Sequence, residues 1–148
     1  MLIGLLMMIG CQTEGICADK VPEEAAQLSM ELVPWDSGPE YQDASGWTEV
    51  VYGTQDEWDT FLSDNGLTDP TSGVDFATSD VLLYERIFNG CEFEVVFDGA
   101  YLLDNTRYVR ARDGEYDAHS CDVYDPRHAI LVLEKVDGTE LEFCEPAG

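Results

Sequence analysis

Basic residues are scarce in this chain. Its 148 residues include 7 lysines and arginines against 31 aspartates and glutamates, and the formal net charge at pH 7 is −24. A surface of that sign repels the phosphates of nucleic acid, so we expect no nucleic-acid partner. The same charge favours cations or a basic protein partner, and it also suits the hydration of a protein in salty surroundings.

Catalytic residue types are also few. The chain has two histidines, His119 and His128, and Ser120 and Cys121 directly follow the first. Neighbours on a strand point to opposite faces, whereas a nucleophile and its base must meet within hydrogen-bonding distance. No nucleophile-elbow motif supports a pairing of His128 with Ser120. We therefore predict that the protein is not an enzyme, and we assign no catalytic residue.

No apolar run reaches the roughly 20 residues that cross a bilayer as a helix. Residues 1–10 carry no charge, and Cys11 follows them directly before polar sequence begins. A short apolar segment that ends in a small residue is typical of a secretory signal peptide. The run Leu-Met-Met-Ile-Gly-Cys, which ends at Cys11, resembles the lipobox of bacterial lipoproteins, in which cleavage before the cysteine is followed by its acylation.

This resemblance implies a lipid-anchored protein outside the cytoplasm. We expect residues 1–10 to be removed as the signal peptide and the acylated Cys11 to hold the protein on the bilayer. Residues 11–27 then form a tether, and residues 28–148 form a single domain. Gln12, rather than an acidic residue, follows the cysteine, which favours the outer membrane.

Four cysteines remain once Cys11 is set aside. An even number suits disulfides in an exported chain, because its compartment is oxidising. Four cysteines allow three pairings, of which we favour Cys91 with Cys121 and Cys17 with Cys144. Zinc is the alternative, but no two of the four have the roughly two to four intervening residues that are usual in structural sites.

Calcium is the cation that the acidic loops would suit, because oxygen-rich loops bind hard cations. Asp113, Glu115 and Asp117 alternate in the polar, turn-rich stretch 113–127, and they are our candidate ligands. A second acidic loop holds Asp64, Asn65 and Asp69. Neither loop matches the EF-hand pattern. A calcium-binding structural lipoprotein is the alternative function, and no other cofactor is expected.

Hydrophobic patterning predicts a sheet. The stretch 74–84 ends in a continuous apolar run, which is typical of a strand buried on both faces. Residues 91–97 alternate between apolar and acidic side chains, as in a strand with one buried face. Asp137 and Gly138 predict a hairpin turn between the last two strands. Further strands are expected at 28–32, 47–52, 107–112, 129–133 and 141–143.

One helix is expected, near residues 55–64. Thr54 and Glu57 form a capping box, and Asn65-Gly66 is a stop signal. Trp58 and Phe61, with Leu62, form one apolar stripe that would pack on the sheet. The predicted class is α+β, with a mostly antiparallel sheet of about six to eight strands and one short helix.

Three of the five arginines lie in the predicted strand at 107–112. They form an anion site in one interpretation. We favour the other, in which they pair across strands with carboxylates such as Glu92 and Glu94.

Val74-Asp75-Phe76, followed by a hydrophobic strand, is similar to the core motif of the PrcB C-terminal domain family. The stretch 126–132 resembles the proline-led last strands of that family, and the similarity covers about residues 47–143. Where the family has a Gly-Gly-Tyr-type element, this chain has Asn89-Gly90-Cys91-Glu92-Phe93, so no binding role is carried over from that turn. Members are often bacterial lipoproteins, and the namesake is an accessory subunit of a surface protease complex. The resemblance implies a protein-interaction or accessory, stabilising subunit for an envelope protein, such as a protease.

Overall fold

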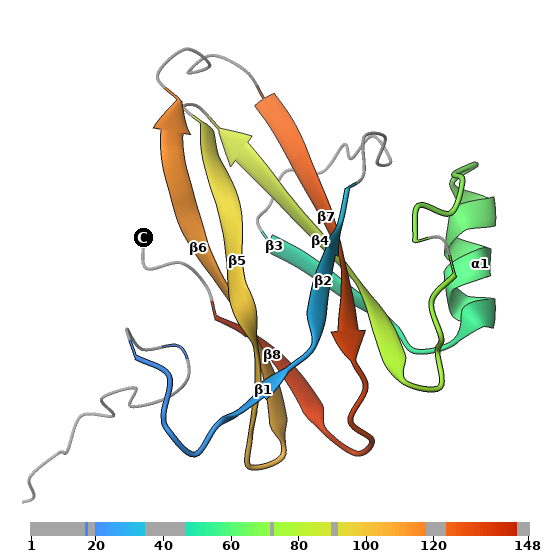
Figure 1. The fold of residues 1–148 in the computed structure, drawn as a ribbon. Coiled ribbons are helices and arrows are strands. Elements are labelled where there is room, and N and C mark those ends of the chain that lie inside the picture. Colours follow the sequence, from blue (N-terminus) through green and yellow to red (C-terminus); the bar gives the residue numbers. More distant parts are fainter. Residues whose placement is uncertain are drawn as a thin grey trace, which may run out of the picture.

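The chain folds into two four-stranded sheets and one helix (Figure 1). The computed structural model describes residues 17, 20–34, 47–71, 73–89, 92–117 and 124–144. Of these, the side chains at 47–48, 86–89, 92–95, 113–117 and 124–128 are left out of the description. The described elements are β1 (Ala26–Leu28), β2 (Met30–Val33), β3 (Trp47–Tyr52), α1 (Gln55–Asp64), β4 (Ser79–Asn89), β5 (Glu92–Leu103), β6 (Thr106–Asp117), β7 (Tyr124–Glu134) and β8 (Glu140–Cys144).

The two sheets and the helix form three layers. One sheet has the order β1-β5-β6-β8, and the other has the order β2-β7-β4-β3. A hydrophobic cluster between the sheets includes Leu82 of β4 and Val109 of β6, and a second cluster joins Val81 of β4 to Trp58 of α1. The β4 sheet is therefore the middle layer, as Figure 1 shows. All strand pairs except β6 with β8 are antiparallel, so the predicted α+β class is confirmed.

Strand β4 is buried on both faces, as its apolar run predicts. Val81 and Leu82 are fully buried, although their side chains point to opposite faces of the sheet. Val81 faces α1, whereas Leu82 faces the other sheet. Tyr84 lies on the same side as Leu82, and its ring meets that of Phe97 on β5 edge-on at 5.3 Å. A strand in the middle layer has no solvated face, which explains why its sequence does not alternate.

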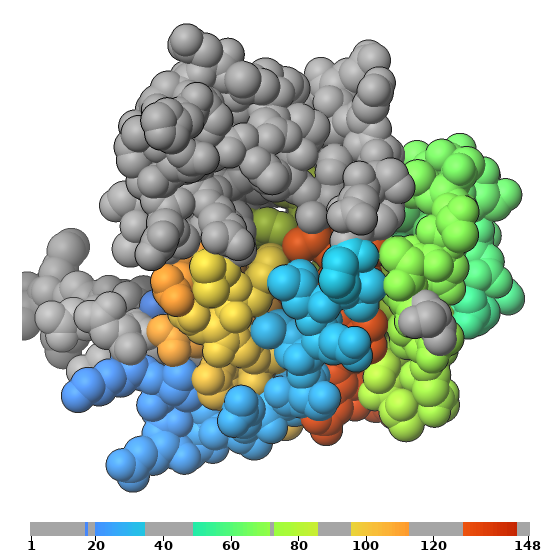
Figure 2. Space-filling view, turned by 45° about the horizontal axis from the view of Figure 1, so that its top comes forward, coloured from blue at the N-terminus to red at the C-terminus, as the bar shows by residue number. Residues whose placement is uncertain are grey.

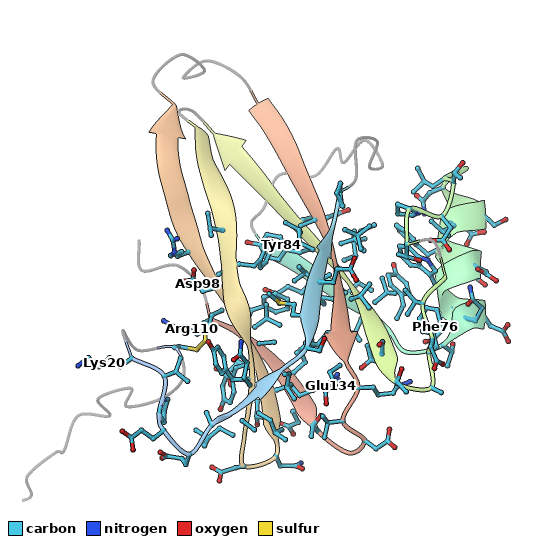
Figure 3. All side chains as sticks on the ribbon, viewed as in Figure 1. Lys20, Phe76, Tyr84, Asp98, Arg110 and Glu134 are labelled. Carbon is cyan, nitrogen blue, oxygen red and sulfur yellow. A yellow bond between two sulfur atoms is a disulfide. The ribbon has the colours of Figure 1, made fainter. Side chains whose placement is uncertain are left out.

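The strand predicted at 28–32 is divided at Ser29 into β1 and β2. Strand β1 pairs with β5 and β2 pairs with β7, so the chain passes here from one sheet to the other. The Ser29 amide donates to Glu134 Oε2 at 2.9 Å, and the Glu134 amide donates to the Ser29 carbonyl at 2.9 Å. Figure 2 shows β2 at the surface between β5 and the segment that follows α1, and Figure 3 labels Glu134 close to the corner.

The predicted hairpin at Asp137-Gly138 is wrong. The chain does turn there, and Gly138 has a φ of +72°. However, β7 and β8 belong to different sheets, and β8 runs parallel to β6. The turn is held instead by the β5–β6 connection, because Asn105 Nδ2 donates to the Gly138 carbonyl at 2.8 Å and the Glu140 amide donates to the Asn105 carbonyl at 3.0 Å.

The helix α1 begins and ends as the sequence predicts. The Thr54 side chain accepts from the Glu57 amide at 3.3 Å, while Glu57 Oε2 accepts from the Thr54 amide at 3.1 Å. Trp58 and Leu62 are buried against the middle sheet, and Asn65 is the C-cap. Within the part of the chain that the structure describes, no helix has the length and hydropathy needed to cross a membrane.

A buried ion pair joins the two sheets. Arg107 of β6 donates through Nη1 to Asp80 Oδ2 of β4 at 2.7 Å, and both side chains are at most 7% exposed. Lys135 Nζ lies 3.4 Å from the other Asp80 oxygen. Lys135 also donates to the carbonyls of Gly53 at 2.7 Å and Phe76 at 2.8 Å. One aspartate and two cations therefore connect both sheets to the segments that flank α1.

Two of the three arginines of β6 bind carboxylates other than Glu92 and Glu94. Arg112 pairs with Asp98 on the neighbouring β5 at 2.9 Å, and Arg107 reaches Asp80 in the other sheet. The side chains of Glu92 and Glu94 lie outside the described residues. Ion pairing within the fold, which we favoured over an anion site, accounts for Arg107 and Arg112. The Arg112 pair joins adjacent strands, whereas the Arg107 pair joins the two sheets.

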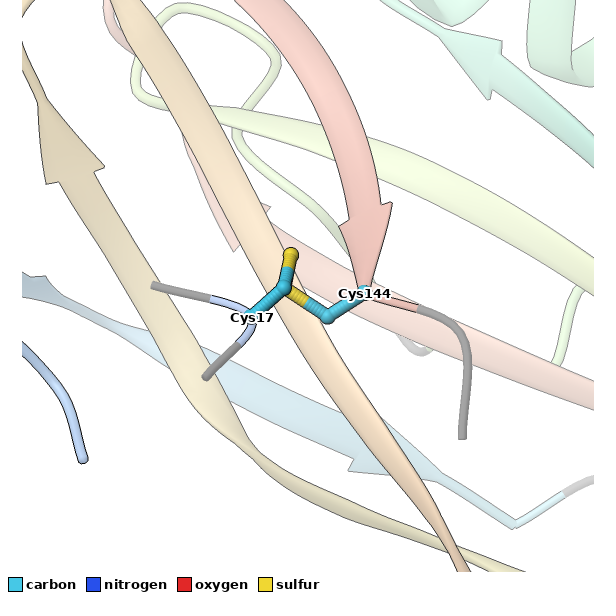
Figure 4. Close-up of a disulfide and its surroundings, with 2 residues drawn as sticks. All are labelled: Cys17 and Cys144. Atoms are coloured by element: carbon cyan, nitrogen blue, oxygen red, sulfur yellow. A yellow bond between two sulfur atoms is a disulfide. The ribbon is translucent and has the colours of Figure 1, made fainter. Parts of the chain in front are cut away.

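A disulfide joins Cys17 to Cys144, the last residue of β8, as the sequence predicts (Figure 4). The two Cα atoms are 5.0 Å apart, which suits the bond. Cys11, Cys91 and Cys121 lie outside the described residues, so their predicted roles stay predictions. The disulfide ties the segment before β1 to the end of the last strand.

Replacing Arg107 with alanine should lower the free energy of unfolding by about 3–5 kcal/mol, because it leaves the Asp80 carboxylate buried without its closest cation. Arg112→Ala is the matched control, since its ion pair with Asp98 is exposed and should contribute less than about 1 kcal/mol. Urea unfolding followed by tryptophan fluorescence measures both. Equal losses in the two variants would contradict the structural role of the buried pair.

Removing the disulfide by a Cys17→Ser, Cys144→Ser double substitution should also destabilise the domain. The bond spans 127 residues of sequence, and closing so long a loop stabilises a fold by about 4–5 kcal/mol in the chain-entropy model. The urea midpoint of the double variant should fall well below that of the oxidised parent. An unchanged midpoint, or a non-reduced digest without the Cys17–Cys144 peptide pair, would count against this assignment.

Candidate functional site

The candidate calcium ligands Asp113, Glu115 and Asp117 lie in strand β6 and not in the loop that we expected. The pairing of β5 with β6 shifts its register beside them, between Phe93 and Val95. Their side chains lie outside the described residues, so calcium binding there stays a prediction. Among the side chains that are described, no three from histidine, cysteine, aspartate and glutamate gather as a metal site.

In the acidic loop after α1, the Asp69 carboxylate accepts hydrogen bonds from other groups of the protein. Asp69 Oδ1 accepts from the buried Trp58 indole N–H at 3.1 Å, from the Thr71 amide at 2.8 Å and from the Thr71 hydroxyl at 2.6 Å. Burial acts to raise the pKa of Asp69, but the hydrogen bonds from Thr71 and Trp58 outweigh it and place that pKa below its usual value. Asp69 thus holds Trp58 and its own loop in place.

An open groove lies between β3 and α1. It has a volume of about 530 Å³ and is lined by two residues of β3 and by one face of the helix with its cap. Its apolar part includes the rings of Tyr52 and Phe61, whose centres are 5.1 Å apart. The lining consists of Val51, Tyr52, Asp56, Glu57, Thr60, Phe61, Asp64 and Asn65.

The groove runs beside a sheet edge. Strand β3 is the last strand of the middle sheet, and among the described strands it pairs only with β4. Val50 and Val51 are 37% and 42% exposed. They pair with Leu83 and Leu82, which face α1 and the other sheet respectively, so the edge presents one exposed valine on each of its faces.

Acidic groups form the rim of this groove. The helix carries Asp56, Glu57, Asp59 and Asp64 and no basic residue. Glu57 is used for capping, because its Oε2 accepts from the amides of Gly53 and Thr54 at 3.0 and 3.1 Å. The carboxylates of Asp56 and Asp64 are exposed on the groove side. The rim therefore attracts cationic groups and repels anionic ones.

Glu85 of β4 and Tyr52 of β3 both have a raised pKa. Burial raises the pKa of the Glu85 carboxyl, and burial together with the charge of Glu85 raises the pKa of Tyr52. The Tyr52 hydroxyl is therefore protonated at neutral pH and available as a donor or acceptor. The lining residues include no histidine, cysteine or lysine. The groove can bind apolar and cationic groups, but it contains no nucleophile with a base beside it.

The sequence predicted the strand and the helix that form this groove, but it did not predict the groove itself. The stretch 47–52 is a predicted strand, and the stripe of Trp58, Phe61 and Leu62 is predicted core. Trp58 and Leu62 are buried as expected, whereas Phe61 is half-buried and lines the groove. The one available signal was the helix itself, whose outer face carries acids with no base at a distance of three or four residues.

Comparison of the chain with protein-family models, with curated proteins and with solved structures gives no match. The similarity to the PrcB C-terminal domain family therefore stays a prediction.

Replacing Asp69 with alanine should lower the free energy of unfolding at pH 7 by about 1–3 kcal/mol, because the buried Trp58 indole loses its acceptor. The folded-state pKa of Asp69 is depressed, so its ionised form stabilises the fold above the unfolded pKa of about 3.9. The difference from the parent should shrink as the pH falls through the folded-state pKa. Thermal melts between pH 7 and pH 2.5 measure it.

Asp69→Asn is the matched control, since it keeps an acceptor for Trp58 and loses only the titration. It should retain most of the stability at pH 7 and show a flatter dependence on pH. An Asp69→Ala variant as stable as the parent at pH 7 would contradict the role of this carboxylate.

Proposed function

We propose that this chain is an exported lipoprotein whose folded domain binds another protein of the cell envelope as an accessory or stabilising subunit. The observation that carries the binding role is the groove beside β3, where an apolar sheet edge and an acidic helix face lie together. Exposed apolar side chains next to an unpaired strand edge are a feature of protein-binding surfaces.

Export is supported by the two ends of the chain. Residues 1–10 followed by Cys11 resemble a lipoprotein signal, and the disulfide between Cys17 and Cys144 suits an oxidising compartment. Lipidation at Cys11 would anchor the protein to the bilayer, with the outer membrane favoured by Gln12. Only the five residues 12–16 would then separate the lipid from the disulfide, so the domain would sit within about 20 Å of the membrane surface.

The accessory role draws on the similarity to the PrcB C-terminal domain family. The residues of its core motif have structural roles here. At the turn before β4, the Asp75 carbonyl accepts hydrogen bonds from the amides of Thr78 and Ser79, and the Asp75 carboxylate accepts one from the Ala77 amide at 3.0 Å. Phe76 packs against the α1 cluster, and its carbonyl accepts a hydrogen bond from Lys135. Figure 3 labels Phe76 beside α1. The motif thus positions β4 and α1 and brings no catalytic group, which favours an accessory subunit, for example of a protease, over an enzyme.

A photoreactive residue placed at Val51 should form an adduct with one envelope protein in intact cells that make the full-length lipoprotein. The reason is that Val51 is exposed on the edge strand β3 and is one of the residues beside the groove. The same group at Glu142, which is exposed on the edge strand β8, is the control and should give no such adduct. Gel electrophoresis and mass spectrometry identify the product. Recovery of the protein always alone, with no adduct from Val51, would contradict the binding function.

A further inference from the structure

We infer that the segment bound at the groove is an extended strand of the partner that carries lysine or arginine, and that it adds to β3 at the edge opposite β4, where β3 pairs with no other described strand. This inference rests on the proposed protein-binding function and specifies its partner chemistry. It follows from the length of the β3 edge, from the alternation of its side chains and from the charge of α1.

Strand β3 offers the longest terminal edge among the described strands. The four terminal strands are β1, β2, β3 and β8, with 3, 4, 6 and 5 residues respectively. The one charged residue of β3 is Glu49, and the strand has no register shift against β4 and contains no proline or lysine. Those are the devices that usually keep an edge from pairing with another strand. An edge without them is suited to accept one.

An added strand would enter the groove. It would lie roughly 4.8 Å from β3 and place its side chains alternately on the two faces of the sheet. On the α1 face its neighbours would be Val50 and Tyr52, which pair with Leu83 and Val81 of the α1 cluster. Side chains on that face would therefore reach the groove lining, whose apolar part is Tyr52 and Phe61. Main-chain hydrogen bonds would supply affinity, and the groove would select alternate side chains.

The charge of the rim selects a basic occupant. Asp56 and Asp64 lie eight residues apart along α1, which is about two turns, and both are exposed on the groove. Lysine or arginine side chains at alternate positions of the strand would approach these carboxylates. A second copy of this chain would place the same acids against one another, and its net charge of −24 adds repulsion. The occupant is therefore a basic segment of a different protein.

The test uses the full-length lipoprotein in detergent micelles and a blocked peptide, Lys-Val-Lys-Val-Lys-Val-Lys. Fluorescence anisotropy should show saturable binding that weakens as salt rises, since the pairs with the rim are exposed. Nuclear magnetic resonance should show cross-strand contacts from the peptide to Val50 and Val51. A peptide with glutamate in place of lysine should not bind. A peptide with proline in place of the central valine keeps all four lysines but cannot form the complete ladder, and it should bind at least about tenfold more weakly.

The protein variants test the rim. Asp56→Lys with Asp64→Lys should weaken binding of the lysine peptide by about tenfold or more, because two attractive exposed pairs become repulsive. Glu140→Lys with Glu142→Lys on β8 changes the net charge equally and should leave binding within about twofold. Asp56→Asn with Asp64→Asn removes charge without reversal and should give an intermediate loss. A thermal melt confirms that each variant is folded.

Three results would overturn the inference. The first is equal binding of the proline peptide and the lysine peptide. The second is an equal loss of peptide affinity in the groove variant and the β8 variant. The third is no binding of the lysine peptide. If the Val51 crosslink nevertheless captures one envelope protein, the binding function stands and the strand addition is wrong. If neither the peptide nor the crosslink gives a product, the proposed function is itself wrong.

Discussion

A single buried carboxylate, that of Asp80, connects the two sheets and, through Lys135, the segments before and after α1. Arg107 reaches it from the opposite sheet, and Lys135 reaches it from the segment after β7. A buried charge without a partner is costly, so each of these groups requires the others to be in place. In a chain with only seven lysines and arginines, two of them meet at this one aspartate.

The same group of charges positions the candidate binding site. Lys135 donates to the carbonyl of Gly53, the residue between β3 and the cap of α1, and Glu57 accepts from the amide of that glycine. Both walls of the groove therefore meet at a residue that is hydrogen-bonded on both sides. Trp58, which is fully buried and held by Asp69, fixes the helix against the middle sheet. A groove built on such supports can keep its shape when nothing is bound.

The acidic residues fall into two groups with different roles. Asp69, Asp80 and Glu57 accept hydrogen bonds that hold loops, layers and a helix start. Asp56 and Asp64 are exposed on α1 and line the groove. The acids of the first group contribute to the fold, since their carboxylates are paired or hydrogen-bonded. The second group makes the rim of the groove negatively charged, and this charge is the reason to infer a basic partner.

Elements whose signals are local can be predicted from the sequence alone. The capping box at Thr54 and the apolar run of β4 were predicted with their positions, because helix caps and side-chain periodicity act over a few residues. The pairing of Cys17 with Cys144 was a preference among three possibilities, and the structure contains it. Trp58 and Leu62 of the helix stripe are buried as predicted, but the pattern did not show that Phe61 stays half-buried in a groove.

The neighbours of each strand are set by the packing of distant segments, which no local pattern in the sequence encodes. The division at Ser29, the parallel pairing of β8 with β6 and the terminal place of β3 all depend on contacts between distant segments. Periodicity shows that a strand has an apolar face, but it does not show which layer covers that face or which edge stays open. The groove and the Asp80–Arg107 pair belong to this second class, because each is made by residues that the chain brings together only when its layers pack.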